Sequence, residues 1–331
     1  MQVGEGVARA AESGTSGGPA SASDKARIKV RVSLFFDGTL NNRANTRARE
    51  RDAASFREHG SGDSSYANDL SNVARLEENL RDRATGYDHF LPIYVEGIGT
   101  LDGGADNLVG AALGTGRTGV VGKVTLAVEA AIRRLRELDY VPRDTTIELL
   151  TIDTCGFSRG AAAARHCVHR VLNDDARPGL RTRLELGGWE VGTLEVLAVG
   201  LFDTVSAYGV MHRNDVAELR LDAIASARSV LQLAAAEEYR DNFSLTNIAS
   251  AGGKGREVYL PGAHSDIGGG YVDGGSEAKV LVRNAHSSVV ARFLGERGWY
   301  TTSGDGAELR HVATVVDTPD GPVPIEYVTV T

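Results

Sequence analysis

The chain has 331 residues, 42% of them hydrophobic, and a formal net charge of −8. This length allows one large or two medium domains with a sizeable core. The negative charge excludes a general nucleic-acid-binding protein, which would need an excess of Lys and Arg to neutralise phosphates. The sequence has no apolar run near the ~20 residues that span a membrane and no secretory signal peptide, so we expect synthesis in the cytoplasm.

Segments typical of strands and helices alternate from residue 27 to residue 297. The preceding residues 1–26 are rich in Gly, Ala and Ser, and we expect a disordered tail there. The alternation predicts an α/β fold with a mostly parallel central sheet and helices on both faces. Residues 27–331 would form a single domain, with loop insertions at 41–88 and 204–250.

Hydrophobic periodicity and turn residues predict the individual elements. Strands are expected at residues 27–36, 90–95, 147–152, 193–202, 257–260, 311–316 and 324–330, the last two paired through a turn at Asp320-Gly321. Helices are expected at residues 69–80, 120–138, 160–172, 216–236 and 278–295. Pro92 places its strand at a sheet edge or a bulge, because proline cannot donate a backbone hydrogen bond. The last five residues are strand-like, as expected for a fragment of a longer protein.

The turn between strand 147–152 and helix 160–172 contains Gly156-x-Ser158-x-Gly160. A sharp turn from strand to helix leaves the serine strained and exposed, and side chains two positions before and after it would collide with neighbouring backbone. The pattern therefore predicts a nucleophile elbow, and the alternative is an ordinary Gly-Ser turn.

Two segments could supply the backbone N–H groups of an oxyanion hole. Arg159 follows the serine at the start of a helix, where its N–H and the helix dipole favour negative charge. The first strand ends in Asp37-Gly38-Thr39-Leu40-Asn41-Asn42, a polar glycine turn at the place where open α/β sheets contact ligands. An early strand–helix loop often supplies the second donor, so we expect Gly38 and Arg159 to form the hole.

Two more polar residues follow predicted strands. Asp203 comes directly after strand 193–202, and His264 lies in a glycine-framed loop after strand 257–260. With Ser158 they stand in the order Ser, Asp, His, which is the order of α/β-hydrolases. Ser158 would attack an acyl carbonyl, His264 would accept its proton, and Asp203 would orient the imidazole. The sequence thus predicts an α/β-hydrolase-like catalytic triad.

Three other carboxylates compete with Asp203 for the role of the acid. Asp153 precedes the serine on the same strand, and we do not expect it to reach the histidine. Asp175 lies in the turn after the elbow helix, and Asp266 could fix the His264 loop by accepting hydrogen bonds from backbone N–H groups. Asp203 is preferred because it directly follows a buried strand.

Histidine and cysteine pairs flank the predicted nucleophile. His166 and His169 stand at i and i+3 of one helix, but no third ligand at suitable spacing supports a metal site, so we expect solvated histidines. Cys155 and Cys167 lie on a strand end and a helix, and we expect two buried free thiols. The predicted mechanism requires neither a metal ion nor a cofactor.

A glycine-rich segment covers residues 97–122. Its Gly114-x-Gly116-x-x-Gly119 matches a dinucleotide fingerprint but lacks a convincing preceding strand, so we expect a shaped loop beside the active site. Acidic loop residues could bind Ca²⁺ if the fold gathers them; these residues are Asp37, Asp102, Asp106 and Asp266.

Several short motifs occur in order between residues 35 and 271. They are Phe35-Phe36-Asp37-Gly38-Thr39-x-Asn41-Asn42, Gly97-Ile98-Gly99-Thr100, Gly156-Phe157-Ser158-Arg159-Gly160-Ala161, Phe202-Asp203-Thr204-Val205, Glu238-x-Arg240-x-x-Phe243, and Pro261-Gly262-x-His264-Ser265-Asp266-Ile267-Gly268-Gly269-Gly270-Tyr271. Through these motifs the chain resembles the Tle1-like α/β-hydrolases, which include phospholipase effectors of the type VI secretion system. The resemblance implies that Ser158, Asp203 and His264 act on phospholipid acyl esters.

The resemblance also implies an antibacterial role. The protein would be secreted by the type VI system into the periplasm of a target cell, with a secretion-apparatus carrier, an immunity protein and a phospholipid membrane surface as partners. Phospholipase A activity is the leading hypothesis. The alternatives are an esterase or thioesterase on a soluble acyl substrate, and a non-catalytic or nucleotide-binding module. An apolar lid would favour lipid, and residues 230–236 are the candidate lid.

Overall fold

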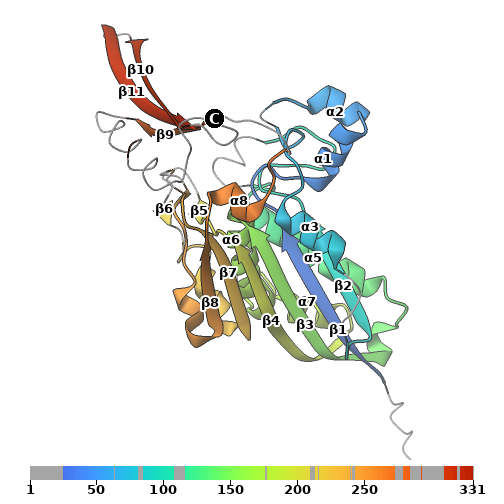
Figure 1. The fold of residues 1–331 in the computed structure, drawn as a ribbon. Coiled ribbons are helices and arrows are strands. Elements are labelled where there is room, and N and C mark those ends of the chain that lie inside the picture. Colours follow the sequence, from blue (N-terminus) through green and yellow to red (C-terminus); the bar gives the residue numbers. More distant parts are fainter. Residues whose placement is uncertain are drawn as a thin grey trace, which may run out of the picture.

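The computed structural model describes residues 25–62, 64–80, 85–107, 116–175, 177–208, 213–214, 216–238, 240, 243–272, 279–283, 292, 309–318 and 321–330. Six strands form the central sheet in the order β2-β1-β3-β4-β7-β8, and every neighbouring pair is parallel (Figure 1). The strands are β1 (Ala26–Phe36), β2 (His89–Val95), β3 (Thr145–Phe157), β4 (Glu190–Phe202), β7 (Ser229–Ala235) and β8 (Gly255–Leu260). The predicted α/β fold with a mostly parallel sheet is confirmed.

Helices lie on both faces of this sheet, as predicted (Figure 1). On one face, α5, α6 and α7 contribute side chains to the larger hydrophobic cluster, which also contains Phe36 of β1. Phe35 belongs to a second cluster, in which Val73 of α3 meets Phe157. The helices are α1 (Arg43–Glu50), α2 (Ala54–His59), α3 (Asn72–Asn79), α5 (Val120–Arg136), α6 (Arg159–Leu172), α7 (Leu180–Leu186), α8 (His264–Gly268), and the 3₁₀ helices η1 (Pro142–Asp144), η2 (Leu221–Ser226) and η4 (Ala249–Lys254).

The central position of β1 and β3 in the sheet explains why their sequences are so apolar. β1 and β3 each have a parallel neighbour on both sides, and residues such as Val30, Val32 and Ile152 are completely buried. β2 lies at one edge, where Pro92 can be accommodated without loss of a ladder hydrogen bond, so the prediction from Pro92 is confirmed. The carboxyl ends of β1, β3 and β4 therefore meet at the centre of one sheet edge.

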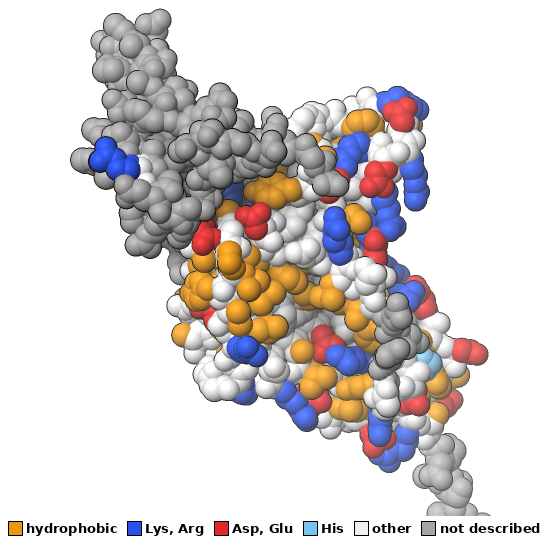
Figure 2. Space-filling model, viewed as in Figure 1, with side chains coloured by type: hydrophobic (Ala, Val, Ile, Leu, Met, Phe, Trp, Pro, Cys, Tyr) orange, Lys and Arg blue, Asp and Glu red, His pale blue; other side chains and the backbone are white. Residues whose placement is uncertain are grey.

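Apolar side chains gather over part of the sheet face seen in Figure 2, in the region of β4, β7 and β8. Leu231 of β7 is 42% exposed. Nearer β1 the side chains on this face are polar. Arg31 and Ser33 of β1 both donate hydrogen bonds to Asp153 of β3. None of the helices that the structure describes is long and apolar enough to cross a membrane.

Two smaller sheets complete the described secondary structure. β10 (Leu309–Thr318) and β11 (Gly321–Val330) pair antiparallel, and β11 also pairs antiparallel with β9 (Lys279–Arg283). β5 (Ala207–Tyr208) and β6 (Arg213–Asn214) pair antiparallel. The predicted pairing of the last two strands is confirmed; of the predicted turn Asp320-Gly321, residue 320 lies outside the described residues and Gly321 begins β11.

Two helix predictions are wrong. Residues 229–235 of the predicted helix 216–236 form β7, and only η2 within it is helical. Its Ala and Leu residues favour a helix locally, but hydrogen bonding to β4 and β8 on both sides outweighs this propensity. The apolar run 230–236 therefore belongs largely to a sheet strand and does not form a lid, and segment 204–250 contributes to the central sheet. Residues 279–283 form β9 instead of a helix, and most of the remaining predicted helix lies outside the described residues.

Candidate active site

Ser158 occupies the turn between β3 and α6 with φ 58° and ψ −125°. Residues other than glycine adopt this region at a cost of about 1–3 kcal/mol, and only where the surroundings hold the backbone. Here the Ser158 N–H donates to the Phe202 carbonyl over 3.0 Å, and the Ser158 carbonyl accepts from Ala161 N–H over 3.0 Å and from Val205 N–H over 3.3 Å. The turn thus has the strained strand-to-helix geometry of a nucleophile elbow.

Gly156 and Gly160 have no room for a side chain. A Cβ on Gly156 would lie 2.3 Å from the Gly160 carbonyl oxygen, and a Cβ on Gly160 would lie 2.2 Å from Asp37 O and 2.4 Å from Phe36 O. These contacts are with main-chain atoms, which cannot rotate away as a side chain can. The glycines therefore allow the elbow to approach the end of β1 closely.

Replacing Gly160 by Ala should destabilise the protein by at least about 3 kcal/mol, because the new methyl group would overlap the main chain at the end of β1. Gly253→Ala is the matched control, since nothing lies within 4 Å of a Cβ placed there. We expect this control to change the free energy of unfolding by less than about 1 kcal/mol. Urea unfolding of both variants measures the difference, and equal stability would contradict the close approach.

Asp203 and His264 come together at the carboxyl edge of the sheet. Asp203 follows β4 and His264 begins α8, and Asp203 Oδ2 lies 2.6 Å from His264 Nδ1. Both side chains are almost fully buried, with 2% and 4% exposed. Asp203 Oδ1 accepts a further hydrogen bond from Ala235 N–H over 2.8 Å, which fixes the carboxylate at the end of β7. A carboxylate held in this way orients an imidazole and selects the tautomer that carries a proton on Nδ1.

The other nitrogen of His264 has no protein partner among the described residues. Nε2 is buried and makes no hydrogen bond there, so no hydrogen bond joins it to Ser158. The imidazole nevertheless lies beside the elbow, because its ring centre is 4.7 Å from that of Phe157, the residue before Ser158. Catalytic hydrogen bonds are often long without substrate and tighten when it binds.

The loop after β1 lies against the elbow. Arg159 Nε donates to Thr39 Oγ1 over 2.9 Å, and a Cβ on Gly38 would overlap the Phe157 ring. The Gly38 N–H, which we expected to face an oxyanion, donates to Asp37 Oδ1 over 2.7 Å. The next N–H, that of Thr39, makes no hydrogen bond with any described residue. Sequence reasoning missed Thr39, whose one signal was its place directly after the glycine.

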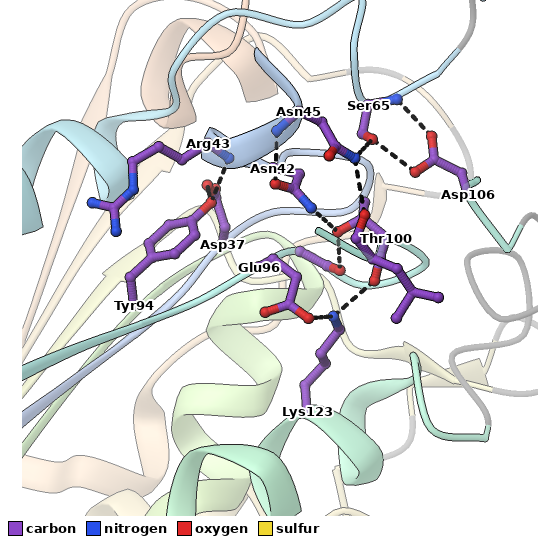
Figure 3. A network of polar contacts seen from close by, with 12 residues as sticks. Asp37, Asn42, Arg43, Asn45, Ser65, Tyr94, Glu96, Thr100, Asp106 and Lys123 are labelled. Atoms are coloured by element: carbon purple, nitrogen blue, oxygen red, sulfur yellow. Dashed lines mark hydrogen bonds and ion pairs between the residues drawn. The ribbon is translucent and has the colours of Figure 1, made fainter. Parts of the chain in front are cut away.

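A network of polar contacts holds the loop after β1 in place (Figure 3). Tyr94 donates to Asp37 Oδ2 over 2.6 Å, and Arg43 N–H donates to the Tyr94 oxygen over 3.0 Å. Burial raises the pKa of Asp37, and hydrogen bonds from Ser71, Tyr94 and Gly38 offset only part of this effect. A buried carboxylate that keeps several donors fixes the conformation of the loop beside the elbow.

The described part of the glycine-rich segment supports the same loop. Lys123 Nζ donates to Glu96 over 2.7 Å and to the Thr100 carbonyl over 2.9 Å, and Asn42 donates to Thr100 Oγ1 over 3.1 Å (Figure 3). Burial lowers the pKa of Lys123, which is only 1% exposed. The buried pair ties α5 to residues 96–100 and, through them, to the loop after β1. Residues 108–115, with part of the Gly114–Gly119 fingerprint, lie outside the described residues.

The competing acids have other partners. Asp153 binds Arg31 and Ser33, Asp175 binds Arg170, and Asp266 accepts the Ala263 N–H over 2.7 Å as predicted. The structure therefore brings Asp203, but none of these three, into a hydrogen bond with His264. No group of three His, Cys, Asp or Glu residues within the described ranges could hold a metal ion.

The residues flanking the elbow differ in how well they were predicted. Cys155 and Cys167 are buried free thiols, as expected, and burial raises the pKa of each to about 12. His166 was expected to be solvated, but it is only 7% exposed and its Nδ1 lies 2.8 Å from the Leu219 carbonyl. Packing of α6 against η2, which the sequence did not predict, explains this burial.

Comparison with known proteins supports the resemblance. Residues 188–293 match the model of a family described as T6SS, phospholipase effector Tle1-like, catalytic domain. The structure is similar to that of a Tle1 effector bound to the VgrG spike of the Type 6 secretion system, with a TM-score of 0.58 and 23% identity, covering 92% of this chain and 68% of that chain. The resemblance inferred from the motifs is confirmed, and the structural similarity confirms the fold.

Weaker structural similarities were also found. An uncharacterised protein from Pseudomonas aeruginosa has a TM-score of 0.40 and 19% identity, covering 74% of this chain and 42% of that chain. Esterase PE8 has a TM-score of 0.31 and 14% identity, covering 73% of this chain and 87% of that chain. No curated protein matches the chain.

Proposed function

We propose that this chain is a serine-dependent hydrolase of lipid acyl esters, of the phospholipase A type. The observation that carries the proposal is the buried Asp203–His264 pair, whose imidazole packs against Phe157, the residue before the strained Ser158. A nucleophile, a base and an orienting carboxylate are the groups that acyl transfer through a covalent intermediate requires. The Tle1-like match over residues 188–293 supports lipid as the substrate class.

The residues would divide the reaction as follows. Ser158 Oγ attacks the acyl carbonyl while His264 Nε2 takes its proton, and Asp203 stabilises the resulting imidazolium. The tetrahedral intermediate collapses and expels the lysophospholipid alkoxide, which receives the proton from His264. Water, deprotonated by His264, then attacks the acyl-serine ester and releases the fatty acid together with free Ser158. Each half of the cycle returns His264 to its neutral form, and none of these steps uses a metal ion or cofactor.

The oxyanion hole would be formed by the backbone N–H of Arg159 and by the loop after β1. Because Gly38 N–H already donates to Asp37, the donor that this loop offers is the Thr39 N–H. The Arg159 side chain, bonded to Thr39 Oγ1, holds the two parts of the hole together. Donors fixed before the reaction stabilise the developing charge without reorganisation.

We also propose an antibacterial role as a type VI secretion effector. The similar Tle1 effector was solved bound to the VgrG spike, which supports a secretion-apparatus carrier as a partner. Delivery into the periplasm of a target cell and protection of the producer by an immunity protein follow from the same proposal. Binding of purified chain to a VgrG spike, measured by co-elution in size-exclusion chromatography, tests the carrier.

Fatty-acid release from mixed phospholipid vesicles tests lipid hydrolysis directly. We expect wild-type protein to release fatty acid, and Ser158→Ala to define the background. A short soluble ester is assayed in parallel, because an esterase on a soluble acyl substrate is the second candidate. Cleavage of the soluble ester without any cleavage of vesicles would retain the hydrolase and reject the lipid substrate. Activity that persists in Ser158→Ala would reject both.

A further inference from the structure

His264 is held by a second set of residues on the chain segment after β7. Its ring centre lies 4.8 Å from that of Phe243, with the two planes at 75°, so the rings meet edge to face. Its backbone N–H donates to Glu238 Oε2 over 3.2 Å. The Asp203 contact does not involve these residues, so the imidazole is supported from two directions.

Arg240 connects these two supports. Its guanidinium carbon lies 3.6 Å from the centre of the Phe243 ring. Its Nε and Nη2 donate to Glu238 Oε1 and Oε2 over 2.8 and 2.7 Å, a two-pronged ion pair. These contacts form a closed chain. The His264 ring contacts Phe243, Phe243 contacts Arg240, Arg240 pairs with Glu238, and Glu238 accepts the His264 backbone N–H. We call these three residues, Glu238, Arg240 and Phe243, the histidine clamp.

The charges within the histidine clamp are balanced. The Glu238 side chain is only 8% exposed. Burial by itself would raise the pKa of Glu238, but hydrogen bonds and the charge from Arg240, together with the His264 N–H, hold it below its usual range. The carboxylate therefore stays ionised beside His264 because Arg240 neutralises it.

The histidine clamp and the Asp203 carboxylate line the same cavity, which has a volume of about 250 Å³. Asp203, Glu238, Arg240 and Phe243 all line it. Removing the guanidinium would leave two carboxylates facing this cavity with no cation between them. Negative charge that is not neutralised next to an imidazole favours its protonated form.

We propose that Arg240 is a positioning residue for His264: it clamps Phe243 against the imidazole and neutralises Glu238, so that the ring keeps the orientation that its hydrogen bond with Asp203 requires. The role of the imidazole as a base rests on the proposed function. The geometry of the histidine clamp does not depend on that function.

Titration of His264 by NMR tests this proposal without a substrate. The His264 signal is assigned with a His264→Asn variant and followed in wild type, in Arg240→Gln and in the double variant Glu238→Gln/Arg240→Gln. Asp203 contacts the His264 ring, Glu238 accepts the His264 N–H, and Arg240 pairs with Glu238. The other charged or titratable groups nearby are Asp266 on α8 itself, Glu237 after β7, Tyr259 on β8, and Arg75, Glu77 and Glu78 on α3, which packs against α8. Only the two clamp charges change between these variants.

In Arg240→Gln the midpoint of the His264 titration should move to higher pH by about one unit, because the unpaired Glu238 carboxylate favours the imidazolium. The double variant removes that carboxylate and should return the midpoint to within about 0.3 units of wild type. Arg228→Gln is the matched control, since Arg228 pairs with Glu195 at an exposed position and should leave the midpoint unchanged. An unchanged midpoint in Arg240→Gln, or a shift that the double variant keeps in full, would overturn the proposal.

Kinetics of the same variants separate positioning from folding. Arg240→Gln should lower kcat by about tenfold with KM within about twofold, and Arg240→Lys should recover part of the loss. A wild-type chain that hydrolyses no ester would contradict the proposed function. The titration would still test whether Arg240 positions His264. Equal losses for the Lys and Gln variants would argue against a role for the Arg240 charge.

Discussion

Replacing Ser158 by Ala should lower kcat by about a millionfold, because the residue that we propose as the nucleophile is lost. The fold should survive, since none of the main-chain hydrogen bonds that hold the elbow uses the Ser158 hydroxyl. The remaining rate should reflect the oxyanion donors and substrate binding alone. Fatty-acid release under single-turnover conditions measures this loss, and circular dichroism checks the fold.

Ser158→Gly provides a control with an independent readout. Glycine adopts φ 58° and ψ −125° without the strain that serine carries there, so this variant should be inactive and more stable than Ser158→Ala by about 1–2 kcal/mol. A free energy of unfolding that is no higher for Gly than for Ala would show that the elbow is not strained. Substantial turnover by either variant would reject Ser158 as the nucleophile.

Asp203→Asn should lower kcat by about four orders of magnitude. An amide cannot stabilise the imidazolium, and its NH₂ group would favour the tautomer with a bare Nδ1. The fold should persist because the Asn oxygen can still accept from Ala235 N–H, and because Asn tolerates the positive φ of 42° at this position. The decrease should appear in kcat more than in KM.

Asp153→Asn is the matched control for this second prediction. Asp153 lies on the neighbouring strand β3 and its side chain is 13% exposed, but its partners are Arg31 and Ser33. We expect its activity to stay within about threefold of wild type. If Asp153→Asn and Asp203→Asn were equally impaired, the loss would come from the sheet and not from the contact with His264.

The elbow shows how much a local pattern can predict. A strand, two glycines around a serine and a helix all lie within residues 145–172, and the structure contains each of them there. The clashes at Gly156 and Gly160 confirm that these positions exclude side chains. Because the elbow is built from residues adjacent in sequence, no long-range contact had to be known.

The errors occurred where distant segments decide the structure. Residues 229–235 resemble a helix by composition, but they pair with β4 and β8, whose positions the sequence alone did not reveal. His166 lies against the Leu219 carbonyl, just before η2, and Leu219 and η2 both belong to the same misassigned segment. The Gly38 N–H is occupied by the neighbouring carboxylate, which Tyr94 holds from another strand.

The sequence by itself determined the α/β fold class, the elbow and the chain order of Ser158, Asp203 and His264, because each of these depends on local periodicity and on turn residues. Only the tertiary structure decided that Asp203 and His264, 61 residues apart, lie in hydrogen-bonding contact, and that Arg240 supports the imidazole through Phe243. Such contacts depend on how parallel strands align at one sheet edge. Pairing between segments far apart in the chain sets that alignment, and local propensity does not encode it.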